Sequence, residues 1–248
     1  MKLAAMTYEE VAALCARGSA VVLVPVGSVE PHGPHLPLDT DAVISETAAE
    51  RAARELEAKG VPVAVAPTLP YGVTDYAAGF AGAIGVPAAA LTALLRGLVE
   101  KLLATGFAHV CLVNNHLEPA HDAAVRAAVE GLAKGAASVA CPLTRRWGRT
   151  LSDEFKRGDC HAGRYETSLV IAAGRDVRPV ATELATLGIS LAEAIRSGKS
   201  TFAEIGMARA YTGAPAEATR EEGDALYAKL VTMIVTEVEE GLAAARAS

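Results

Sequence analysis

Continuous apolar runs alternate with amphipathic, alanine-rich stretches along the first part of the chain. The runs lie at 20–26, 61–66, 109–114 and 138–143. Short apolar runs without polar alternation are typical of strands buried on both faces. Pro62, near the start of the second run, indicates an exposed start or an edge strand. The pattern therefore predicts about four strands of a mostly parallel sheet.

One predicted helix lies before the first strand, and a second lies between the first and second strands. Thr7 and Glu10 have the spacing of a capping box, and Gly18 ends the helix that they begin. A second predicted helix, rich in Ala and Glu, ends at Gly60. The three candidates for its N-cap are Asp39, Thr40 and Asp41.

The same alternation continues toward the middle of the chain. Pro87 stands at the first position of a predicted helix that stops at Gly106, and another helix runs from about Pro119 to Ala133. Crossover helices between parallel strands cover both faces of a sheet. The sequence therefore predicts an α/β fold with three α/β/α layers.

The signals weaken beyond Trp147. Helical segments are expected after His161, after Ser190 with Glu193 as a capping box, and from 220 to 245. No linker, repeat or charge block divides the chain. We therefore expect residues 1–248 to form a single domain.

Composition narrows the class of protein. Of 248 residues, 51% are hydrophobic and 4% aromatic, and the net charge is −6, which gives no basic footprint for nucleic acid. No apolar run reaches the roughly 18 residues of a membrane span. Four dispersed cysteines fit reduced thiols and not a disulfide framework. We expect a soluble, cytoplasmic protein without nucleic-acid or membrane partners.

Titratable residues gather after two of the strands and at one later place. Ligands of parallel sheets bind beyond the carboxyl ends of the strands, where such loops meet. The segment 27–41, GSVEPHGPHLPLDTD, carries Glu30, His32, His35, Asp39 and Asp41. The segment 114–122, NNHLEPAHD, carries His116, Glu118, His121 and Asp122. The segment 158–168, GDCHAGRYETS, carries Asp159, His161 and Glu166.

Imidazole together with carboxylate suits zinc or manganese, and one carboxylate can bridge two ions. Glu30 and His32 are two residues apart, so in an extended loop their side chains point to opposite sides and reach different ions. His116 and Glu118 repeat this spacing, and Asp41 is placed to serve both ions. The spacing predicts one ion held by Glu30, Asp41 and His116 and a second held by His32, Asp41 and Glu118.

Each of these residues also has a simpler interpretation. Asp39 or Asp41 alone is explained as an N-cap. His121 and Asp122 fall in the first turns of a helix, and we interpret them as structural. His35 either orients a metal ligand by a hydrogen bond or is structural. The case for a metal site therefore rests on the set, because independent caps have no reason to gather at one end of a sheet.

At these residues the chain resembles the creatininase family of metal-dependent amidohydrolases. GSVEPHGPHLPLDTD resembles the family's long first motif, and NNHLE stands where most members have Asn-Gly-His-Gly-Gly-Asn. HAGRYETS resembles its His-Ala-Gly element followed by Glu-Thr-Ser. The segments GFAGAIGVP (79–87) and GAPAEATREEG (213–223) extend the resemblance in the family's order over nearly the whole chain.

The resemblance implies two divalent ions, Zn²⁺ or Mn²⁺ with Fe²⁺ as a further candidate. It also implies that a metal-bridging hydroxide hydrolyses a linear or cyclic C–N amide bond of a small molecule. The ligands carried over are the same two sets, with Glu118 also in the catalytic group. His161 matches the histidine that protonates the leaving nitrogen, and Glu166 orients it or touches the metal-bound water, unless it is a helix-start carboxylate. A homo-oligomer, commonly a hexamer in this family, is implied as well.

The departures from the family pattern concern the substrate. Leu117 replaces a tyrosine, Cys160 stands where creatininase has a carboxylate, and Trp147 is the only tryptophan. They predict a substrate other than creatinine. The candidates for substrate contact are Tyr71, Thr74, Asp75, Tyr76, Leu117 and Cys160. Four arginines are either anion-binding or simply solvated; they are Arg145, Arg146, Arg149 and Arg164.

Two other classes of function stay open at this point. One is a catalytically silent member that binds a metal or a metabolite. The other is a hydrolase that cleaves a carbon–carbon or ester bond at the same ions. The intact set of candidate ligands argues against the silent member, because a silent relative is free to lose His161 or Glu118.

Overall fold

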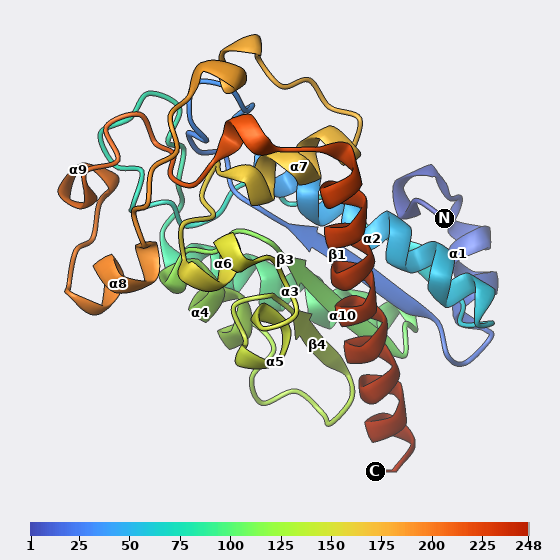
Figure 1. The fold of residues 1–248 in the computed structure, drawn as a ribbon. Helices are drawn as coiled ribbons and strands as arrows, with labels where there is room; N and C mark the ends of the chain where they lie inside the picture. Colours follow the sequence, from blue (N-terminus) through green and yellow to red (C-terminus); the bar gives the residue numbers. More distant parts are fainter. Residues whose placement is uncertain (248) are drawn as a thin grey trace.

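The computed structural model describes residues 1–247 and contains the predicted parallel sheet (Figure 1). Its strands are β1 (Val21–Val26), β2 (Val63–Val65), β3 (His109–Asn114) and β4 (Ala137–Ala140). They pair in the order β2-β1-β3-β4, and every pairing is parallel. The prediction of a four-stranded parallel sheet is confirmed, and β2, which follows Pro62, is an edge strand.

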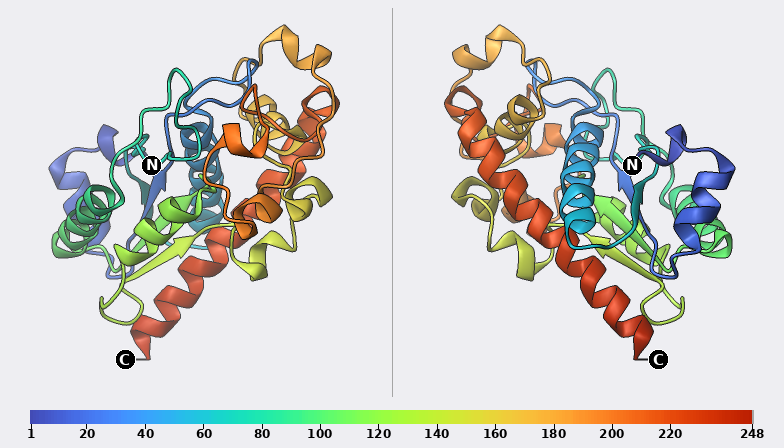
Figure 2. Two further views of the ribbon diagram at one scale, coloured as in Figure 1. Left: turned by 90° about the vertical axis from the view of Figure 1, so that its left-hand side faces the viewer. Right: turned by 90° about the vertical axis from the view of Figure 1, so that its right-hand side faces the viewer.

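One face of the sheet is covered by α1 (Tyr8–Cys15), α3 (Ala88–Thr105) and α4 (Pro119–Ala127). Alternate strand residues point to this face, among them Val22 and Val24 of β1. They pack against the leucines of α3, and the two views of Figure 2 show these helices on one side of the strands. This face gives one of the two apolar cores.

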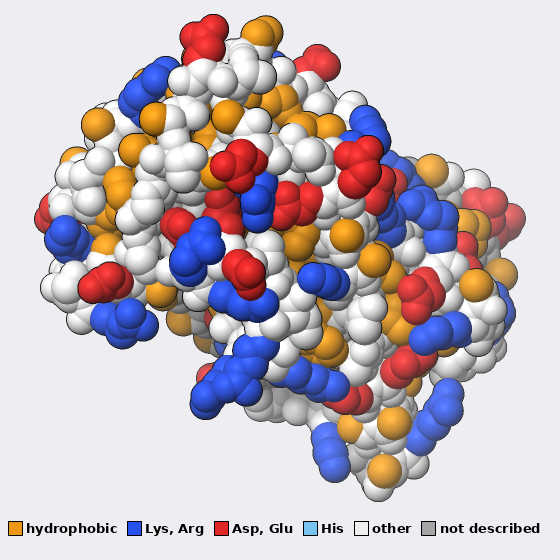
Figure 3. All heavy atoms as spheres, in the orientation of Figure 1, with side chains coloured by type: hydrophobic (Ala, Val, Ile, Leu, Met, Phe, Trp, Pro, Cys, Tyr) orange, Lys and Arg blue, Asp and Glu red, His pale blue; other side chains and the backbone are white. Residues whose placement is uncertain are grey.

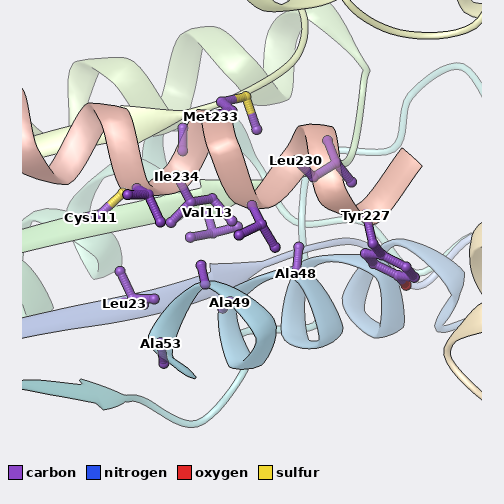
Figure 4. Packing of buried hydrophobic residues seen from close by; sticks show 14 of the residues in the cluster. Leu23, Ala48, Ala49, Ala53, Cys111, Val113, Tyr227, Leu230, Met233 and Ile234 are labelled. Atoms are coloured by element: carbon purple, nitrogen blue, oxygen red, sulfur yellow. The ribbon is translucent and has the colours of Figure 1, made fainter. Parts of the chain in front are cut away.

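The opposite face is covered by α2 (Thr40–Ala58), α7 (Arg164–Ala172) and α10 (Arg220–Arg246). Leu23 and Val113 of the central strands point to this side, and the long α10 crosses it (Figure 4). The buried face of α2 is built from small residues, including Ala48 and Ala49, so the helix lies close to the strands. The three-layer α/β/α prediction is therefore confirmed.

Short helices complete the second half of the chain. They are α5 (Arg145–Gly148), α6 (Asp153–Arg157), α8 (Leu191–Arg196) and α9 (Phe202–Ile205), with 3₁₀ turns at Leu3–Ala5, Pro179–Glu183 and Pro215–Glu217. Figure 1 shows α8 and α9 together at the left of the molecule, on the side of α6. Tyr76 and Phe80 pack onto the α8–α9 segment in a small separate apolar cluster.

Several predicted boundaries are right and two are wrong. Thr7 and Glu10 form the expected capping box of α1, and the Ser190 side chain caps α8 by accepting the Glu193 N–H, without the reciprocal bond of the expected box among the described residues. The helix α4 ends at Ala127 and not at Ala133, because the Arg96 guanidinium takes the Ala127 carbonyl oxygen (3.2 Å) and the chain turns. The strand β4 ends at Ala140, before Pro142, which has no N–H to donate to a ladder.

The first turn of α2 also differs from the capping prediction. Asp39 occupies the N-cap position without a side-chain capping bond, and it pairs instead with Arg175 at 3.0 Å. The Thr40 hydroxyl donates to the Pro37 carbonyl oxygen. Asp41 therefore has no capping role, and its carboxylate is available elsewhere. Within residues 1–247, no helix is long and apolar enough to cross a membrane.

Candidate active site

The three polar segments meet at the carboxyl end of the sheet. Two follow β1 and β3 directly, and the third precedes α7. Their titratable side chains are at most 7% exposed; they are Glu30, His32, Asp41, His116, Glu118, His161 and Glu166. Buried charges are costly unless they are paired or coordinate a metal. The arrangement therefore favours the binding of cations among these carboxylates.

The first predicted ligand set lies together. The Nδ1 atom of His116 is 3.0 Å from Asp41 Oδ2 and 3.4 Å from Glu30 Oε1. One donor atom from each residue lies within 4.8 Å of the others, a spacing suited to one metal ion. Three segments far apart in sequence thus supply one nitrogen and two carboxylates.

The second set differs from the prediction in one member. His32 Nε2 lies 3.2 Å from Asp41 Oδ1 and 3.5 Å from Glu166 Oε2, and these three residues form a second group within 4.8 Å. Asp41 belongs to both groups. His32 Nε2 is also 3.8 Å from Glu30 Oε1. The expectation that Glu30 and His32 point to opposite sides is therefore wrong, because the Pro- and Gly-rich loop is not an extended strand.

Glu118 is the residue that the second group leaves out. Its carboxylate accepts the backbone N–H groups of Asp75 (3.1 Å) and Tyr76 (3.3 Å), and it lies 4.0 Å from His116 Nε2. A third candidate metal group among the described residues consists of Glu30, His32 and His161, and none of the three groups contains Glu118. Because both oxygens are turned toward the loop after β2, Glu118 lies beside the ligand groups and also lines the cavity above them.

Backbone carbonyls fix the two imidazoles that face Asp41. His32 Nδ1 lies 3.1 Å from the Glu30 carbonyl oxygen, and His116 Nε2 lies 2.6 Å from that of Val73. A carbonyl only accepts, so each of these nitrogens carries the proton. The other nitrogen of each ring faces the carboxylates, and once unprotonated its lone pair is available to a metal ion, as in the usual arrangement of a metal-bound histidine.

Close packing and one hydroxyl hold the carboxylates of the first group. Gly27, just after β1, touches the first turn of α2 so closely that a Cβ there would lie 2.5 Å from the Ala42 nitrogen. This contact seats Asp41 at the strand end. The Thr74 hydroxyl donates to Glu30 Oε2. The predicted substrate residue Thr74 thus holds Glu30 and does not line the cavity.

The loop that carries His161 is tied down by a buried carboxylate that the sequence analysis did not single out. Glu154 of α6 accepts the backbone N–H groups of Arg164 (3.1 Å), Tyr165 (2.6 Å) and Ala214 (2.8 Å). Its only local signal in the sequence is its place two residues after Ser152, the N-cap of α6. Its contacts satisfy the first turn of α7, whose N-cap residue makes no side-chain capping bond.

Glu166 is positioned by an unusual backbone. Ala162 adopts a left-handed conformation, with φ of +49°, which costs free energy for a residue with a side chain. Its N–H donates to Glu166 Oε2 at 2.6 Å. The His-Ala-Gly element therefore turns sharply so that His161 and Glu166 face the same point.

Electrostatics in the cluster favour added positive charge. Burial alone lowers the pKa of His32, but the carboxylates of Asp41, Glu166 and Glu30 outweigh it and raise the pKa to about 10. His116 behaves alike, with a pKa of about 10. Burial raises the pKa of Glu166 to about 8. Without metal, protonation of His32, His116 and Glu166 compensates the negative charge of the cluster. Bound divalent ions would compensate this charge in place of the protons.

Other histidines of these segments serve the structure. The Nε2 atom of His35 lies 2.9 Å from the Thr167 hydroxyl, and burial lowers its pKa to about 4. His121 Nδ1 accepts the Val73 N–H at 3.2 Å, and burial lowers its pKa to about 2. Both are uncharged at neutral pH, and neither belongs to a candidate metal group among the described residues.

The atoms of the cluster fit divalent ions. His32 Nε2 and Asp41 Oδ2 are buried without a hydrogen bond of normal geometry. Buried polar atoms in native proteins almost always have partners, so such atoms call for one. The donor set of imidazole nitrogen and carboxylate oxygen is the one that zinc and manganese take.

A cavity of about 380 Å³ opens above the cluster. Of the residues predicted to contact substrate, Tyr76, Leu117 and Cys160 line it, whereas Thr74 and Asp75 do not. Asp75 is exposed and contributes only its backbone N–H to Glu118. Tyr71 is 47% exposed and outside the wall.

The aromatic wall was not predicted. Phe202 of α9 lines the cavity and stacks on His161 with ring centroids 4.5 Å apart, and Phe155 of α6 lines it too. Trp147, in contrast, packs in the core and donates its ring N–H to Glu237 of α10 at 2.7 Å. Burial lowers the pKa of His161 well below its usual value, so this ring is neutral.

Comparisons with known proteins agree with the fold. Over 232 residues the chain is 34% identical to the mycofactocin precursor peptide peptidase of Mycobacterium tuberculosis (strain CDC 1551 / Oshkosh), covering 89% of this chain and 85% of that protein. Two solved structures, a mutant creatininase and one titled creatininase Mn, superpose with TM-scores of 0.75 and 0.71 at 19% and 20% identity. Each comparison covers 97% of this chain and 98% of the other.

A family model agrees with these likenesses and covers most of the sequence. The creatininase model, described as creatinine amidohydrolase, matches residues 4–238. This span includes the three polar segments and all seven buried titratable residues of the cluster. The chain therefore belongs to the creatininase family, whose members are hydrolases.

Proposed function

We propose that this protein hydrolyses the C–N bond of an amide in a small molecule, at two divalent metal ions. The observation that carries the proposal is the pair of donor groups that share Asp41 at the floor of the cavity. Two-ion sites that share a carboxylate are a recurring device for hydrolysis.

The ligands proposed for the first ion are Glu30, Asp41 and His116. Those for the second are His32, Asp41 and Glu166, so Glu166 takes the place that the sequence analysis gave to Glu118. The titles of related creatininase structures name Mn in one case and a Zn–Zn type in another. Divalent ions at these residues would lower the pKa of a water molecule and polarise an amide carbonyl.

His161 is proposed to move the proton that the leaving nitrogen needs. Its Nε2 lies 3.1 Å from the Pro31 carbonyl oxygen and therefore carries a proton. Its Nδ1 faces the cluster, 3.9 Å from Glu30 Oε1, and is free to accept a proton and pass it on. Phe202 stacks on the ring and holds this orientation.

Glu118 is proposed to act on the substrate side of the ions. Its carboxylate lines the cavity, and the N–H groups of Asp75 and Tyr76 fix it in place. Burial raises its pKa to about 7. It is placed to hold a hydrogen bond to the amide group or to the attacking water.

Metal content and turnover test this function together. Purified protein should hold about two divalent ions per chain by elemental mass spectrometry. Asp41→Ala should lose both ions and all hydrolysis, because both donor groups need this residue. Asp39→Ala is the matched control, since Asp39 is two residues away, half-buried and paired with Arg175, and it should keep both ions. Full occupancy in Asp41→Ala would disprove the shared site.

A short peptide is the second candidate substrate. The relative that is 34% identical to this chain is named a precursor peptide peptidase, and a peptide bond is chemically an amide. A panel of simple amides, lactams, formamides and dipeptides separates the candidates by kcat/KM. Absence of turnover across this panel with both ions bound would favour the silent or non-amide alternatives. Cytoplasmic location and a homo-oligomeric state stay predictions from the sequence.

A further inference from the structure

Charge in the cavity wall is separated by depth. The four acidic residues of the wall are all buried at its floor; they are Glu30, Asp41, Glu118 and Glu166. The arginine and lysine residues of the wall are Arg145, Arg149 and Lys156, and all three are exposed. A ligand that reaches from the floor to the mouth therefore meets metal ligands first and cations last.

The structure divides the four arginines that the sequence left undecided. Arg146 makes a two-pronged ion pair with Glu240 at 2.8 and 2.7 Å, and Arg164 pairs with Glu217 and Glu222. These two are committed to holding α10 and the turn before it. They do not line the cavity.

Arg145 and Arg149 have no such partners. Within residues 1–247 neither forms an ion pair with a carboxylate. They are four residues apart at the two ends of the single turn of α5, so both project toward the cavity mouth. Lys156 of α6 joins them and pairs only with the exposed Asp153 at 3.1 Å. Figure 3 shows basic side chains gathered over α5 and α6.

The wall between the floor and the mouth is apolar. It is built from Leu117, Phe155, Leu191, Ile195 and Phe202, which come from four separate segments. The volume of about 380 Å³ falls within the range of small-molecule pockets, roughly 300 to 1,000 Å³. The cavity is thus larger and more apolar than a small polar amide alone would need.

We propose that the substrate is an amide with an apolar body that ends in a carboxylate. The amide lies at the Asp41 cluster, the apolar body contacts Phe155 and Phe202, and the carboxylate binds Arg145 and Arg149 at the mouth. This proposal rests on the proposed amide hydrolysis and adds the substrate class. Guanidinium groups recognise carboxylates with paired hydrogen bonds, which gives the mouth its preference for this group.

Binding of a matched pair of probes tests the proposal without turnover. The pair is 4-(acetamidomethyl)benzoate and 4-(acetamidomethyl)benzyl alcohol, which share an amide and a ring and differ in the carboxylate at the far end of the ring. Titration calorimetry on the metal-loaded protein should give a Kd about 2- to 25-fold lower for the acid, since two ion pairs near a surface contribute about 1.4- to 5-fold each. The preference should shrink as salt is raised.

Variants locate the preference on α5. In the double variant Arg145→Ala/Arg149→Ala the acid should keep at most the small preference that Lys156 contributes, whereas Arg146→Ala should keep the full preference. Arg146→Ala is the matched control, because it removes the same charge from the same helix outside the cavity. Equal binding of the two probes to the wild type overturns the proposal, as does an undiminished acid preference in the double variant. The second result is expected if the carboxylate binds the metal ions directly.

Two sources of such a substrate are separated by kinetics. N-acyl amino acids represent small metabolites, and dipeptides with a free C-terminus represent peptides; each is compared with its carboxamide form. A higher kcat/KM for the acid in either series, lost in Arg145→Ala/Arg149→Ala, supports the proposal and names the source. Faster turnover of the uncharged forms overturns the proposed substrate class and leaves amide hydrolysis intact. Loss of ions from Asp39→Ala but not from Asp41→Ala would instead contradict the proposed two-ion site.

Discussion

The two ends of β3 each carry a buried histidine, and the two have opposite surroundings. His109 opens the strand, and both of its ring nitrogens have partners, the Gly135 carbonyl oxygen at 2.8 Å and the Ser138 hydroxyl at 2.9 Å. His116 follows the strand, with one nitrogen on a carbonyl and the other facing two carboxylates. At the amino end of the sheet both ring nitrogens have neutral hydrogen-bond partners, whereas at the carboxyl end one ring nitrogen faces carboxylates.

The difference shows what separates a structural from a functional buried histidine. Burial is equal, since His109 is 0% and His116 is 3% exposed. What differs is whether the second nitrogen finds a neutral partner or a set of carboxylates. His109 also fills the space that Gly241 of α10 leaves open, because a Cβ there would lie 2.3 Å from its ring. His109 therefore packs α10 against β3, whereas His116 is available to bind a metal ion.

Exchange of each histidine for alanine should separate the two roles most strongly. His116→Ala should lower metal affinity and kcat by more than about 100-fold. Loss of a residue that only hydrogen-bonds to a metal ligand costs up to about this factor, and loss of the ligand itself should cost more. His109→Ala should keep metal content and kcat, but it should unfold more easily by about 1 to 3 kcal/mol, because a buried carbonyl and a hydroxyl lose their partner. Elemental analysis, kinetics and urea unfolding measure these effects.

The same contrast exists among the carboxylates of the carboxyl end. Glu166→Gln should lower the metal content from about two ions per chain to about one, since Glu166 belongs to the second donor group. Glu118→Gln should keep both ions and lose turnover, because the Glu118 oxygens face backbone N–H groups and the cavity. If Glu118→Gln loses an ion and Glu166→Gln does not, the ligand set predicted from the sequence is right.

The smallest expected effect is a pH dependence of stability at the amino end. Burial lowers the pKa of His109 in the folded protein, so its contribution is present above the unfolded value of 6.5 and is lost as the pH falls below it. The unfolding free energy of the wild type, measured by urea titration, should therefore fall between pH 7.5 and 5.5 more steeply than that of His109→Gln, by at most about 1.4 kcal/mol per pH unit. Identical slopes would show that His109 does not contribute.

The fold was predictable where strands and long helices carry strong local signals. The strands β1 and β3 are fully buried apolar runs, and α3 is bounded by Pro87 and Gly106, so their positions follow from the sequence. The helices α5, α6 and α9 have four or five residues each, too few to form without tertiary packing. These short helices beyond Trp147 could therefore not be predicted from local sequence signals.

The candidate site was predictable by composition and less so by geometry. The grouping of Glu30, Asp41 and His116 follows from their places after strands β1 and β3. The place of Glu166 depends on the left-handed turn at Ala162, which no local signal announces. Phe202 comes from a short helix far along the chain and reaches His161 only through the packing of the α8–α9 segment.

One feature of the histidines bears on how such a site changes over generations or moves between scaffolds. The carbonyl oxygens of Glu30, Pro31 and Val73 orient the three imidazoles of the cluster. No side-chain substitution deletes a carbonyl, so these anchors tolerate sequence drift as long as the loops keep their course. A designer who grafts only the ligand side chains onto another sheet would lose the ring orientations, because that information resides in the path of the main chain.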